Sequence, residues 1–532
     1  MPRCPSLKGK NGIGGPTVRL SLGRGAGRRA EHGHRTHRNT SPPFLQLGKC
    51  RPRAPGGPRG RSARCGNGLF AQCVRLRSEI NHFFSVSDRR YCFDEVTRNC
   101  FQVDQASEDA LRIFEASGRT VNSKLLTKSL AAKGYDQTTI AELEDDIDEY
   151  QRLSERTFLT KDTPRKLRSI ELHVSHACNL GCSYCFAGKG DYGTSPLLMT
   201  DEIAFKAVDY LVASSSENET LAIVFFGGEP MINEPLIWKT VDYSKRIYPN
   251  RNFTYSITTN GTLLNDTAVN SFKEHGFSVL ISLDGTGCKH DASRPYKTGG
   301  GSFSDIDKNV RRFSESFPFG ARATLTNNNC NLVEDYLQFK EMGFRRIYFS
   351  PVSSFDENIK LDEHSLNKIR AGLIDLADQY LKQIDQGEKP LFRTLKTAVD
   401  LIMSNRIAFV GCGAGRRFIS VTPEGDVYPC HRFVGMMRFK MGNIVTGIDE
   451  TRYIENWSQG VEKRIDCTDC WARSFCGGGC SWEAADEHGY LPKSLHPASC
   501  EYRKMCYEMA FDLISRHSSS QEKNQREATV SE

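Results

Sequence analysis

The sequence predicts an α/β protein built on a parallel sheet that is open or curled into a partial, TIM-like (β/α)6 barrel. Three observations indicate this fold. Six apolar, β-rich runs follow one another between residues 170 and 350, with amphipathic stretches between them. Short motifs come directly after the first four runs, where ligands bind in such sheets. Ten of the 19 cysteines form two groups with ligand-like spacing.

The order of elements divides the chain into six segments. The predicted strands are 170–174, 222–226, 253–258, 278–283, 321–326 and 345–350. The amphipathic stretches include 201–213, 265–275 and 331–342. We expect a disordered basic extension, a winged-helix-like module, the sheet domain, a helical linker, a cysteine-rich domain and a disordered end, at 1–78, 79–160, 165–360, 361–411, 412–510 and 511–532.

The N-terminal extension differs in charge from the rest of the chain. Residues 1–78 hold 17 Lys and Arg against one acid, which leaves 54 basic and 63 acidic residues elsewhere. The remainder is therefore mildly acidic and has no nucleic-acid signature. The extension has the composition of a solvated, disordered segment, although it could touch anionic partners. It also resembles an organelle transit sequence, or reflects a mis-assigned start, and the next methionine is Met199.

The composition also indicates in which cellular compartment the protein is expected. No run of about 18 apolar residues exists, so we expect no transmembrane helix. The clustered cysteines are typical of metal or cluster binding in a reducing compartment, and no secretory h-region is present. We therefore expect a cytoplasmic protein.

The segment 79–160 is predicted to be a small module. Residues 82–103 show two short β-like runs around turn-prone Ser-Asp and Arg-Asn pairs. Residues 106–153 follow as three helical segments, broken near Gly118 and Gly134. Strands followed by helices in so few residues suggest a winged-helix-like fold.

The loop HACNLGCSYCFAG, residues 176–188, carries three cysteines, Cys178, Cys182 and Cys185. A [4Fe–4S] cluster is normally held by four thiolates, so three leave one iron free for a substrate or cofactor. A structural zinc or unligated thiols are the alternatives. The position directly after the first predicted strand favours the cluster.

This loop resembles the radical S-adenosylmethionine (SAM) superfamily, whose motif is C-x3-C-x2-C with an aromatic residue before the last cysteine. The resemblance implies that SAM fills the open iron site and is cleaved to a 5′-deoxyadenosyl radical. FFGGEP, the TTN that ends the third strand, and polar residues on the fourth and fifth strands support it. An arginine on the fifth strand could equally form a surface ion pair. The implied SAM contacts are Tyr184, Gly227, Gly228, Glu229, Pro230, Thr259, Asn260, Ser282 and Arg322.

The C-terminal group of seven cysteines resembles the SPASM domain of peptide-modifying radical SAM enzymes. A zinc ribbon at 467–480 is the competing interpretation, but it leaves three cysteines unexplained. The resemblance implies two auxiliary clusters. The distal one is assigned to Cys467, Cys470, Cys476 and Cys500, and the nearer one to Cys412, Cys430 and Cys480.

Three [4Fe–4S] clusters need twelve ligands, of which SAM fills one and the motifs supply ten. We expect an open iron on the nearer auxiliary cluster, able to bind a substrate thiolate. Cys506 is the alternative fourth ligand. His176 and His431, each beside a cluster cysteine, are expected to donate hydrogen bonds or to pack, and not to be ligands.

From about residue 80 to 510 the chain resembles maturases that form thioether cross-links in peptides, namely the SCIFF-peptide maturase and the quinohemoprotein amine dehydrogenase maturation protein. CFAGKGDYG, VTPEGDVYPCHRFVG and FKMGNI carry this resemblance. It implies a peptide or small protein substrate, bound through its leader by strand addition, and an electron donor such as ferredoxin or flavodoxin. Alternatives are sulfatase formylglycine formation, carbon–carbon cross-linking, and a zinc-stabilised peptide-binding protein.

Overall fold

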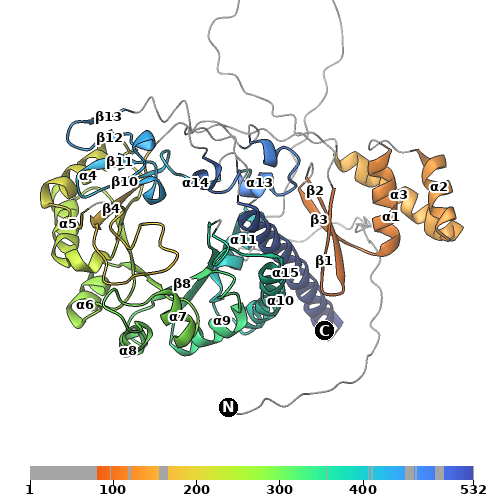
Figure 1. The fold of residues 1–532 in the computed structure, drawn as a ribbon. Helices are drawn as coiled ribbons and strands as arrows, with labels where there is room; N and C mark the ends of the chain where they lie inside the picture. The colour runs from red at the N-terminus through yellow and green to blue at the C-terminus, as the bar shows by residue number, and fades with distance from the viewer. Residues whose placement is uncertain are drawn as a thin grey trace, which may run out of the picture. The chain divides into compact units, whose positions relative to one another are not determined.

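The computed structural model describes most of the chain after residue 80 (Figure 1). The described residues are 81–95, 98–117, 122–154, 166–193, 195–354, 356–404, 406–408, 411–449, 461, 464–485 and 496–530. The predicted basic extension, 1–78, lies outside them. Contacts divide the described residues into two units, one within Asp104–Lys161 and one that joins residues up to Val103 with those from Asp162 onward.

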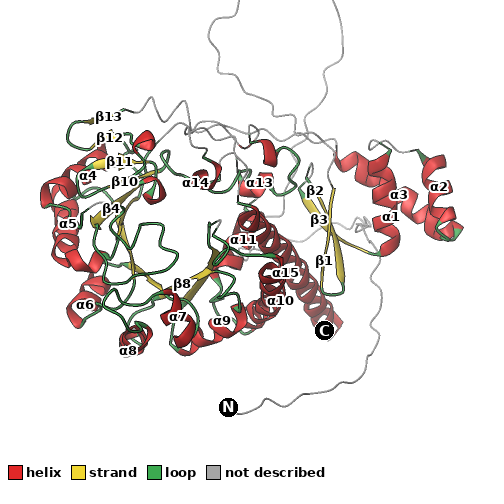
Figure 2. Cartoon of the chain, viewed as in Figure 1, coloured by secondary structure: helices red, strands yellow, loops and turns green. Residues whose placement is uncertain are grey.

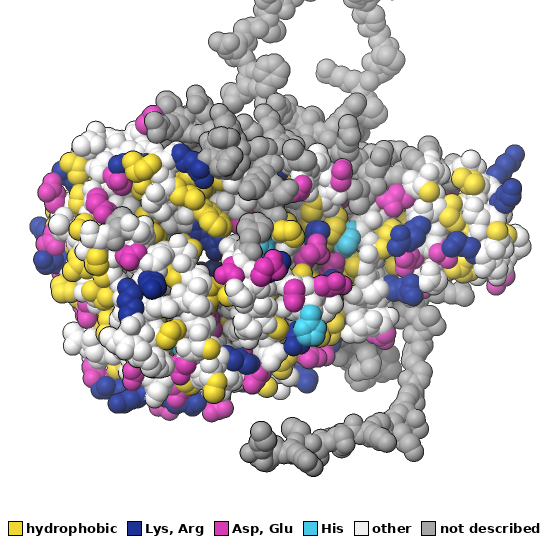
Figure 3. Space-filling model, in the orientation of Figure 1, with side chains coloured by type: hydrophobic (Ala, Val, Ile, Leu, Met, Phe, Trp, Pro, Cys, Tyr) yellow, Lys and Arg dark blue, Asp and Glu magenta, His cyan; other side chains and the backbone are white. Residues whose placement is uncertain are grey.

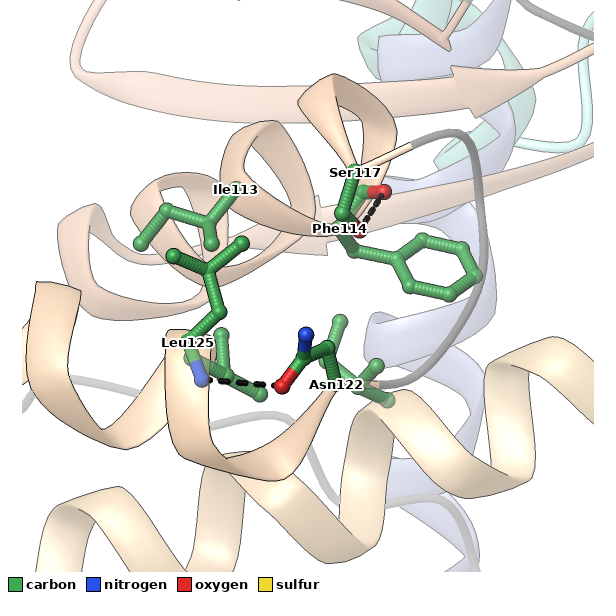
Figure 4. A pocket seen from close by; sticks show the side chains of 7 residues that line it. Ile113, Phe114, Ser117, Asn122 and Leu125 are labelled. Carbon is green, nitrogen blue, oxygen red and sulfur yellow. Dashed lines mark hydrogen bonds between the residues drawn. The ribbon is translucent and has the colours of Figure 1, made fainter.

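The described part of the smaller unit consists of the three predicted helices. They are α1 (Gln105–Ala116), α2 (Ser123–Ala132) and α3 (Gln137–Ser154). Side chains cap the first two, because Asp104 accepts from the Ser107 N–H and Asn122 accepts from the Leu125 N–H. Figure 4 shows the Asn122 cap beside a small cavity that Phe114 and Leu125 also line.

The larger unit is organised around a sheet of ten strands in the order β13-β12-β11-β10-β4-β5-β6-β7-β8-β9. All six predicted strands are present, and they pair in parallel in chain order. The first and last of them do not pair, so the parallel sheet is open. Their bounds are β4 (Ser169–Ser175), β5 (Leu221–Gly227), β6 (Phe253–Thr259), β7 (Ser278–Ser282), β8 (Gly320–Leu325) and β9 (Arg346–Pro351).

The cysteine-rich region extends this sheet. β10 (Phe418–Val421) pairs in parallel with β4, and a meander of short antiparallel strands continues outward from it. These strands are β11 (Asp426–Tyr428), β12 (Gly442–Asn443) and β13 (Gly447–Ile448). The first strand of the sheet domain therefore has neighbours on both sides, one of which comes from the C-terminal domain.

Helices connect and cover the strands (Figures 1 and 2). Those between the parallel strands are α4 (Asp201–Ala213), the 3-10 turn η1 (Pro230–Asn233), α5 (Glu234–Ile247), α6 (Asp266–Glu274), α7 (Gly287–Ser293), α8 (Phe303–Phe313) and α9 (Leu332–Glu341). The later helices are α10 (Glu363–Asp385), α11 (Arg393–Met403), α13 (Arg473–Cys476), α14 (Ser481–Ala484) and α15 (Pro497–Val530). The predicted helices and the helical linker agree with these bounds.

The N-terminal strands differ from the prediction in number. Residues 81–103 form three antiparallel strands, β1 (Asn81–Val86), β2 (Arg89–Asp94) and β3 (Asn99–Val103), and not two. The turn-prone Ser-Asp pair lies between β1 and β2, and the Arg-Asn pair lies where β2 is followed by β3. Two turns separate three strands, and this accounts for the additional strand. This small sheet belongs to the larger unit, whereas the helices that follow it form the smaller one.

Buried polar contacts attach the small sheet to α15. Asp512 is fully buried and accepts hydrogen bonds of 2.7 Å from both Arg89 Nε and Tyr91 Oη. The rings of Phe93 and Trp471 meet edge to face nearby, with their centroids 5.8 Å apart. The same packing corrects the predicted disordered end at 511–532, because Phe511 and Leu513 are buried and α15 continues to Val530.

The surface in Figure 3 carries Lys and Arg side chains interspersed with Asp and Glu on the face in view. No described helix is both long enough and apolar enough to cross a bilayer.

Candidate functional site

A cavity of about 450 Å³ lies at the carboxyl ends of the parallel strands, where an α/β sheet is expected to bind ligands. The predicted SAM-site residues line it together, except Pro230, which is buried in the first turn of η1. The predicted residues that line it are Cys178, Cys182, Tyr184, Cys185, Gly227, Gly228, Glu229, Thr259, Asn260, Ser282 and Arg322. These residues come from β5, β6, β7 and β8 and from the loop that follows β4, so four neighbouring strands and one loop meet at one place.

The three-cysteine loop is held against the turn after β5 by close backbone packing. The Gly228 N–H donates to the Ser175 carbonyl at 2.8 Å, and the Glu229 N–H donates to the Ala177 carbonyl at 2.8 Å. Gly190 lies against Cys178, with room for no side chain between them. Burial raises the pKa of the Cys178 thiol to about 12, a cost that metal coordination removes.

Replacing Gly228 by alanine tests this packing. The added Cβ would collide with the carbonyl oxygens of Ala177 and Gly190, which belong to the backbone and cannot rotate away. We expect the variant to lose at least half of the iron bound at the three-cysteine loop, measured by iron analysis after anaerobic reconstitution. Gly181→Ala is the matched control in the same loop, since its Cβ would meet Lys297 Cγ at an ordinary 3.7 Å. Equal iron in both variants would contradict the prediction.

Glu229 faces the protein and not only the cavity. It is 1% exposed, and its Oε1 accepts from Thr259 Oγ1 at 2.7 Å and from the Met231 N–H at 3.0 Å. Oε2 accepts from the Asn260 N–H at 2.7 Å. Burial raises its pKa to about 7, against the effect of these hydrogen bonds. This carboxyl therefore joins the ends of β5 and β6, and it positions its neighbours in the cavity wall.

A buried polar cluster that the sequence analysis did not identify supports Tyr184 and Cys182. The Tyr184 hydroxyl donates to Asp284, which also accepts from Arg294 Nε at 2.9 Å. Arg294 lies over the Tyr184 ring and places Nη1 4.0 Å from Cys182 Sγ. Burial would raise the pKa of Asp284, but Arg294 and the Thr324 N–H hold it below its usual value. The Asp-Gly pair after the fourth strand was a visible signal for Asp284, whereas Arg294 had none.

Arg322 is a cationic side chain in the cavity without an anionic partner. It has no ion pair or side-chain hydrogen bond with any described residue, so it is not the surface ion-pair residue that was the alternative. The side chain is exposed to the open cavity, but desolvation by the surrounding protein lowers its pKa. The guanidinium groups of Arg432 and Arg294 lower the pKa further, whereas Tyr184 and Asp284 raise it. A bound carboxylate would relieve both effects, because guanidinium and carboxylate form paired hydrogen bonds.

The cavity is lined by the C-terminal domain as well. Arg432 and Trp482 belong to the cysteine-rich region, two residues after Cys430 and Cys480. The Arg432 guanidinium lies 4.9 Å from the Trp482 ring centroid and 5.6 Å from that of Phe186, which follows the three-cysteine loop. One space therefore connects the two cysteine-rich regions.

Four C-terminal cysteines line a second cavity, of about 440 Å³. They are Cys467, Cys470, Cys476 and Cys500, the set assigned to the distal cluster. Arg473, Arg503 and Lys504 line the same space, which suits a negatively charged cluster of thiolates. Arg473 also forms an ion pair of 2.5 Å with Glu95 at the end of β2.

Of the remaining three C-terminal cysteines, two affect the pKa of the third. Burial raises the pKa of Cys430 well above its usual value, and Cys480 and Cys412 raise it further. Cys412 Sγ also lies 3.2 Å from the Ser481 hydroxyl. Among the described residues, no group of three or more His, Cys, Asp or Glu side chains is close enough to hold a single metal ion. Ligands of a four-iron cluster lie farther apart, because the cluster is wider than one ion.

Comparisons with known proteins also distinguish the sheet domain from the cysteine-rich C-terminal domain. A family model described as the radical SAM superfamily matches residues 172–328, and SPASM, described as an iron–sulfur cluster-binding domain, matches residues 412–471. An uncharacterized protein of Methanocaldococcus jannaschii is 30% identical over 287 residues, which cover 52% of this chain and 89% of that protein.

Two further comparisons concern proteins with described activities. A cysteine-type anaerobic sulfatase-maturating enzyme of Clostridium novyi is 28% identical over 347 residues, covering 59% of this chain and 88% of the enzyme. The solved structure of native anSMEcpe with bound AdoMet and Kp18Cys peptide has a TM-score of 0.55 and 22% identity, covering 66% of this chain and 99% of that one. The second similarity concerns the fold.

Proposed function

Because this chain belongs to the radical SAM superfamily and carries a SPASM domain, we propose that it modifies a peptide or small protein by forming thioether cross-links at cysteine. The observation that carries the proposal is the shared cavity. Arg432 and Trp482, beside the nearer auxiliary thiols, line the same space as the three-cysteine loop. A substrate residue there can reach the SAM site while a substrate cysteine approaches Cys412, Cys430 and Cys480.

The residues of the first site fit SAM and a [4Fe–4S] cluster. When bound and reduced, these groups supply a 5′-deoxyadenosyl radical that removes a hydrogen atom from carbon. Cys178, Cys182 and Cys185 would hold the cluster, and Arg322 would bind the SAM carboxylate. Ser282 and the Gly227–Gly228 turn would line the methionine side, and Glu229 would keep Thr259 and Asn260 in place.

The C-terminal thiols would hold two auxiliary clusters, which makes three clusters in all. The distal cavity offers four thiols for four irons, whereas the nearer set offers three. Cys412, Cys430 and Cys480 would hold that cluster with one iron left open, and this iron would supply a binding site for the substrate thiolate. Thioether formation removes two hydrogens, one as an atom from carbon and one as the thiol proton. The surplus electron would leave through the auxiliary clusters to a ferredoxin or flavodoxin in the cytoplasm.

Substrate recognition would use the N-terminal module, residues 79–160. β1 and β3 are the two edges of the small sheet, and an extended leader could pair with an edge through backbone hydrogen bonds. Arg98 and Glu95, in the turn between β2 and β3, contact Phe475 and Arg473 of the distal cluster region. A leader bound at this sheet would be anchored beside the auxiliary site.

A second candidate function is formylglycine formation in a sulfatase. It is favoured by the 28% identity to an enzyme named as a cysteine-type sulfatase-maturating enzyme. In that reaction the cysteine side chain becomes an aldehyde and no cross-link forms. Carbon–carbon cross-linking, in contrast, would leave every substrate thiol free.

The mass of the product tests the proposal. The chain is expressed anaerobically with the small cysteine-rich protein encoded nearest to its gene, and that protein is weighed before and after thiol alkylation. We expect a loss of two hydrogens per bond, with one alkylatable thiol fewer each time and no recovery with reductant. The Cys178→Ala variant should leave the mass unchanged. Loss of sulfur with gain of an aldehyde would favour the sulfatase reaction, and loss of two hydrogens with all thiols free would favour a carbon–carbon bond.

A further inference from the structure

A short antiparallel pairing holds the three-cysteine loop against the segment that follows α7. The pairs of residues, which keep one register throughout, are Gly181 with Pro295, Ser183 with Ser293, Leu180 with Tyr296 and Asn179 with Lys297. In this register Cys182 and Arg294 are directly opposite each other. Side chains that are opposite in an antiparallel pair lie on the same face and within contact distance. The backbone itself therefore brings Arg294 to a predicted cluster ligand.

The Arg294 side chain reaches the thiol with one nitrogen while another is held by a carboxylate. Nη1 lies 4.0 Å from Cys182 Sγ, the outer limit of a hydrogen bond to sulfur, and Nε donates to Asp284 Oδ2 at 2.9 Å. These two nitrogens donate in different directions from the planar guanidinium, so the ion pair leaves the donor that faces the sulfur available. Arg294 is 9% exposed and Asp284 1%, so water competes little for these contacts.

Asp284 is itself fixed, which gives the guanidinium a single orientation. Its Oδ1 accepts from the Thr324 N–H at 2.9 Å. Its Oδ2 also accepts from the Ser293 hydroxyl at 3.1 Å and from the Tyr184 hydroxyl. The guanidinium carbon of Arg294 lies 5.2 Å from the centroid of the Tyr184 ring. The donor beside the sulfur is therefore positioned before any cluster binds.

The donors to another thiol of the same loop are uncharged. Cys178 Sγ lies 3.4 Å from the Leu180 backbone nitrogen and 3.9 Å from Asn260 Nδ2. Hydrogen bonds from a charged donor are roughly twice as strong as those from a neutral one. Arg294 therefore gives Cys182 a stronger kind of donor than Cys178 has.

We propose that Arg294 raises the reduction potential of the cluster at Cys178, Cys182 and Cys185 by donating to the Cys182 sulfur. The inference rests on the proposed function, because it requires that cluster. Reduction potentials of iron–sulfur clusters depend on hydrogen bonds to their sulfurs, and a donor favours the reduced state, in which the sulfurs carry more negative charge. Arg294 acts through a ligand and is a positioning residue. A higher potential makes the cluster easier to reduce by a ferredoxin or flavodoxin.

The Arg294→Met variant tests this role, because it removes the donor and keeps an unbranched side chain. Wild type and variant are reconstituted anaerobically as full chains and titrated with dithionite, and each cluster is followed by electron paramagnetic resonance. The SAM-binding cluster is the one whose signal changes when SAM is added afterwards. We expect its reduction equilibrium to shift at least tenfold towards the oxidised state, which is 59 mV for one electron. The signals of other clusters should shift less than threefold.

The double variant Asp284→Asn, Arg294→Met separates the hydrogen bond from the ion pair, because it leaves no unpaired carboxylate in the interior. We expect the same tenfold shift, and this variant replaces the single one if the latter takes up less iron than wild type. Tyr296→Phe is the matched control in the same segment. It removes the hydroxyl that donates to Asp305 at 2.6 Å and leaves the backbone pairing, so all potentials should shift less than threefold.

The outcomes that overturn the inference are distinct. A SAM-binding cluster that stays within threefold of wild type in the double variant excludes the hydrogen bond as the cause. Weaker SAM binding at an unchanged potential would assign Arg294 to SAM instead. Loss of the loop's iron from both variants would mean that Arg294 only holds the loop together. Wild-type protein without any SAM-sensitive cluster would overturn the proposed function itself, and this inference with it.

Discussion

Replacing Arg322 by alanine is expected to weaken SAM binding about a hundredfold. The arginine lines the cavity without an anionic partner, and neighbouring arginines disfavour its charge until a carboxylate binds. Loss of one partner from a desolvated, hydrogen-bonded charge pair costs about 2–5 kcal/mol, which is roughly thirtyfold to several thousandfold in affinity. The measurement is SAM binding to the anaerobically reconstituted protein, by equilibrium dialysis at fixed salt.

Two controls make this result specific. Arg345→Ala removes an exposed arginine just before β9 and should change the SAM dissociation constant less than threefold. Iron content should be unchanged in both variants, because neither side chain supplies a cluster ligand. A dissociation constant for Arg322→Ala within threefold of wild type would contradict the assignment of this residue to the SAM carboxylate.

Replacing Cys500 by alanine is expected to remove about four of roughly twelve irons per chain, since each [4Fe–4S] cluster normally needs a thiolate on every iron. Cys500 lies on α15 and completes the set of four thiols around the second cavity. Since metal binding contributes directly to folding, the variant should also unfold at a lower temperature than wild type. Iron analysis and thermal unfolding, both under anaerobic conditions, measure the two effects.

Cys506 provides the matched control on the same helix. It is 5% exposed, packs in the core, and lines neither cavity. Cys506→Ala should keep all the iron of wild type. Loss of iron from this variant would mean that Cys506 is the missing ligand of the nearer cluster. The open iron site, and the substrate thiolate proposed to bind it, would then be excluded.

Local sequence patterns were sufficient for the parallel strands and for the thiols. Each of the six strands is an apolar run bounded by turn residues, so it can be recognised as a strand from its own residues alone. The three-cysteine loop and the GGEP turn follow their strands directly, and parallel topology brings strand ends together. For this reason most of the cavity wall could be predicted without knowledge of any distance.

Contacts between distant segments could not be predicted in this way. Arg294 reaches Asp284 and Cys182 from a helix end with no motif of its own. Asp512 lies in a stretch whose sequence suggests a polar tail, and only the strands that pack on it make it part of the core. Sequence patterning reports what a segment prefers in isolation, whereas these residues are defined by a partner elsewhere in the chain.

The pairing of β10 with β4 has a consequence for the order of synthesis. Ser169 of β4 leaves the ribosome long before Phe418, its partner on β10. At about 5–20 residues per second, the delay is on the order of ten seconds or more. During that time β4 has an unpaired edge with apolar residues such as Ile170 and Leu172 beside it. We expect the nascent chain to need protection by a chaperone until the C-terminal domain has been made.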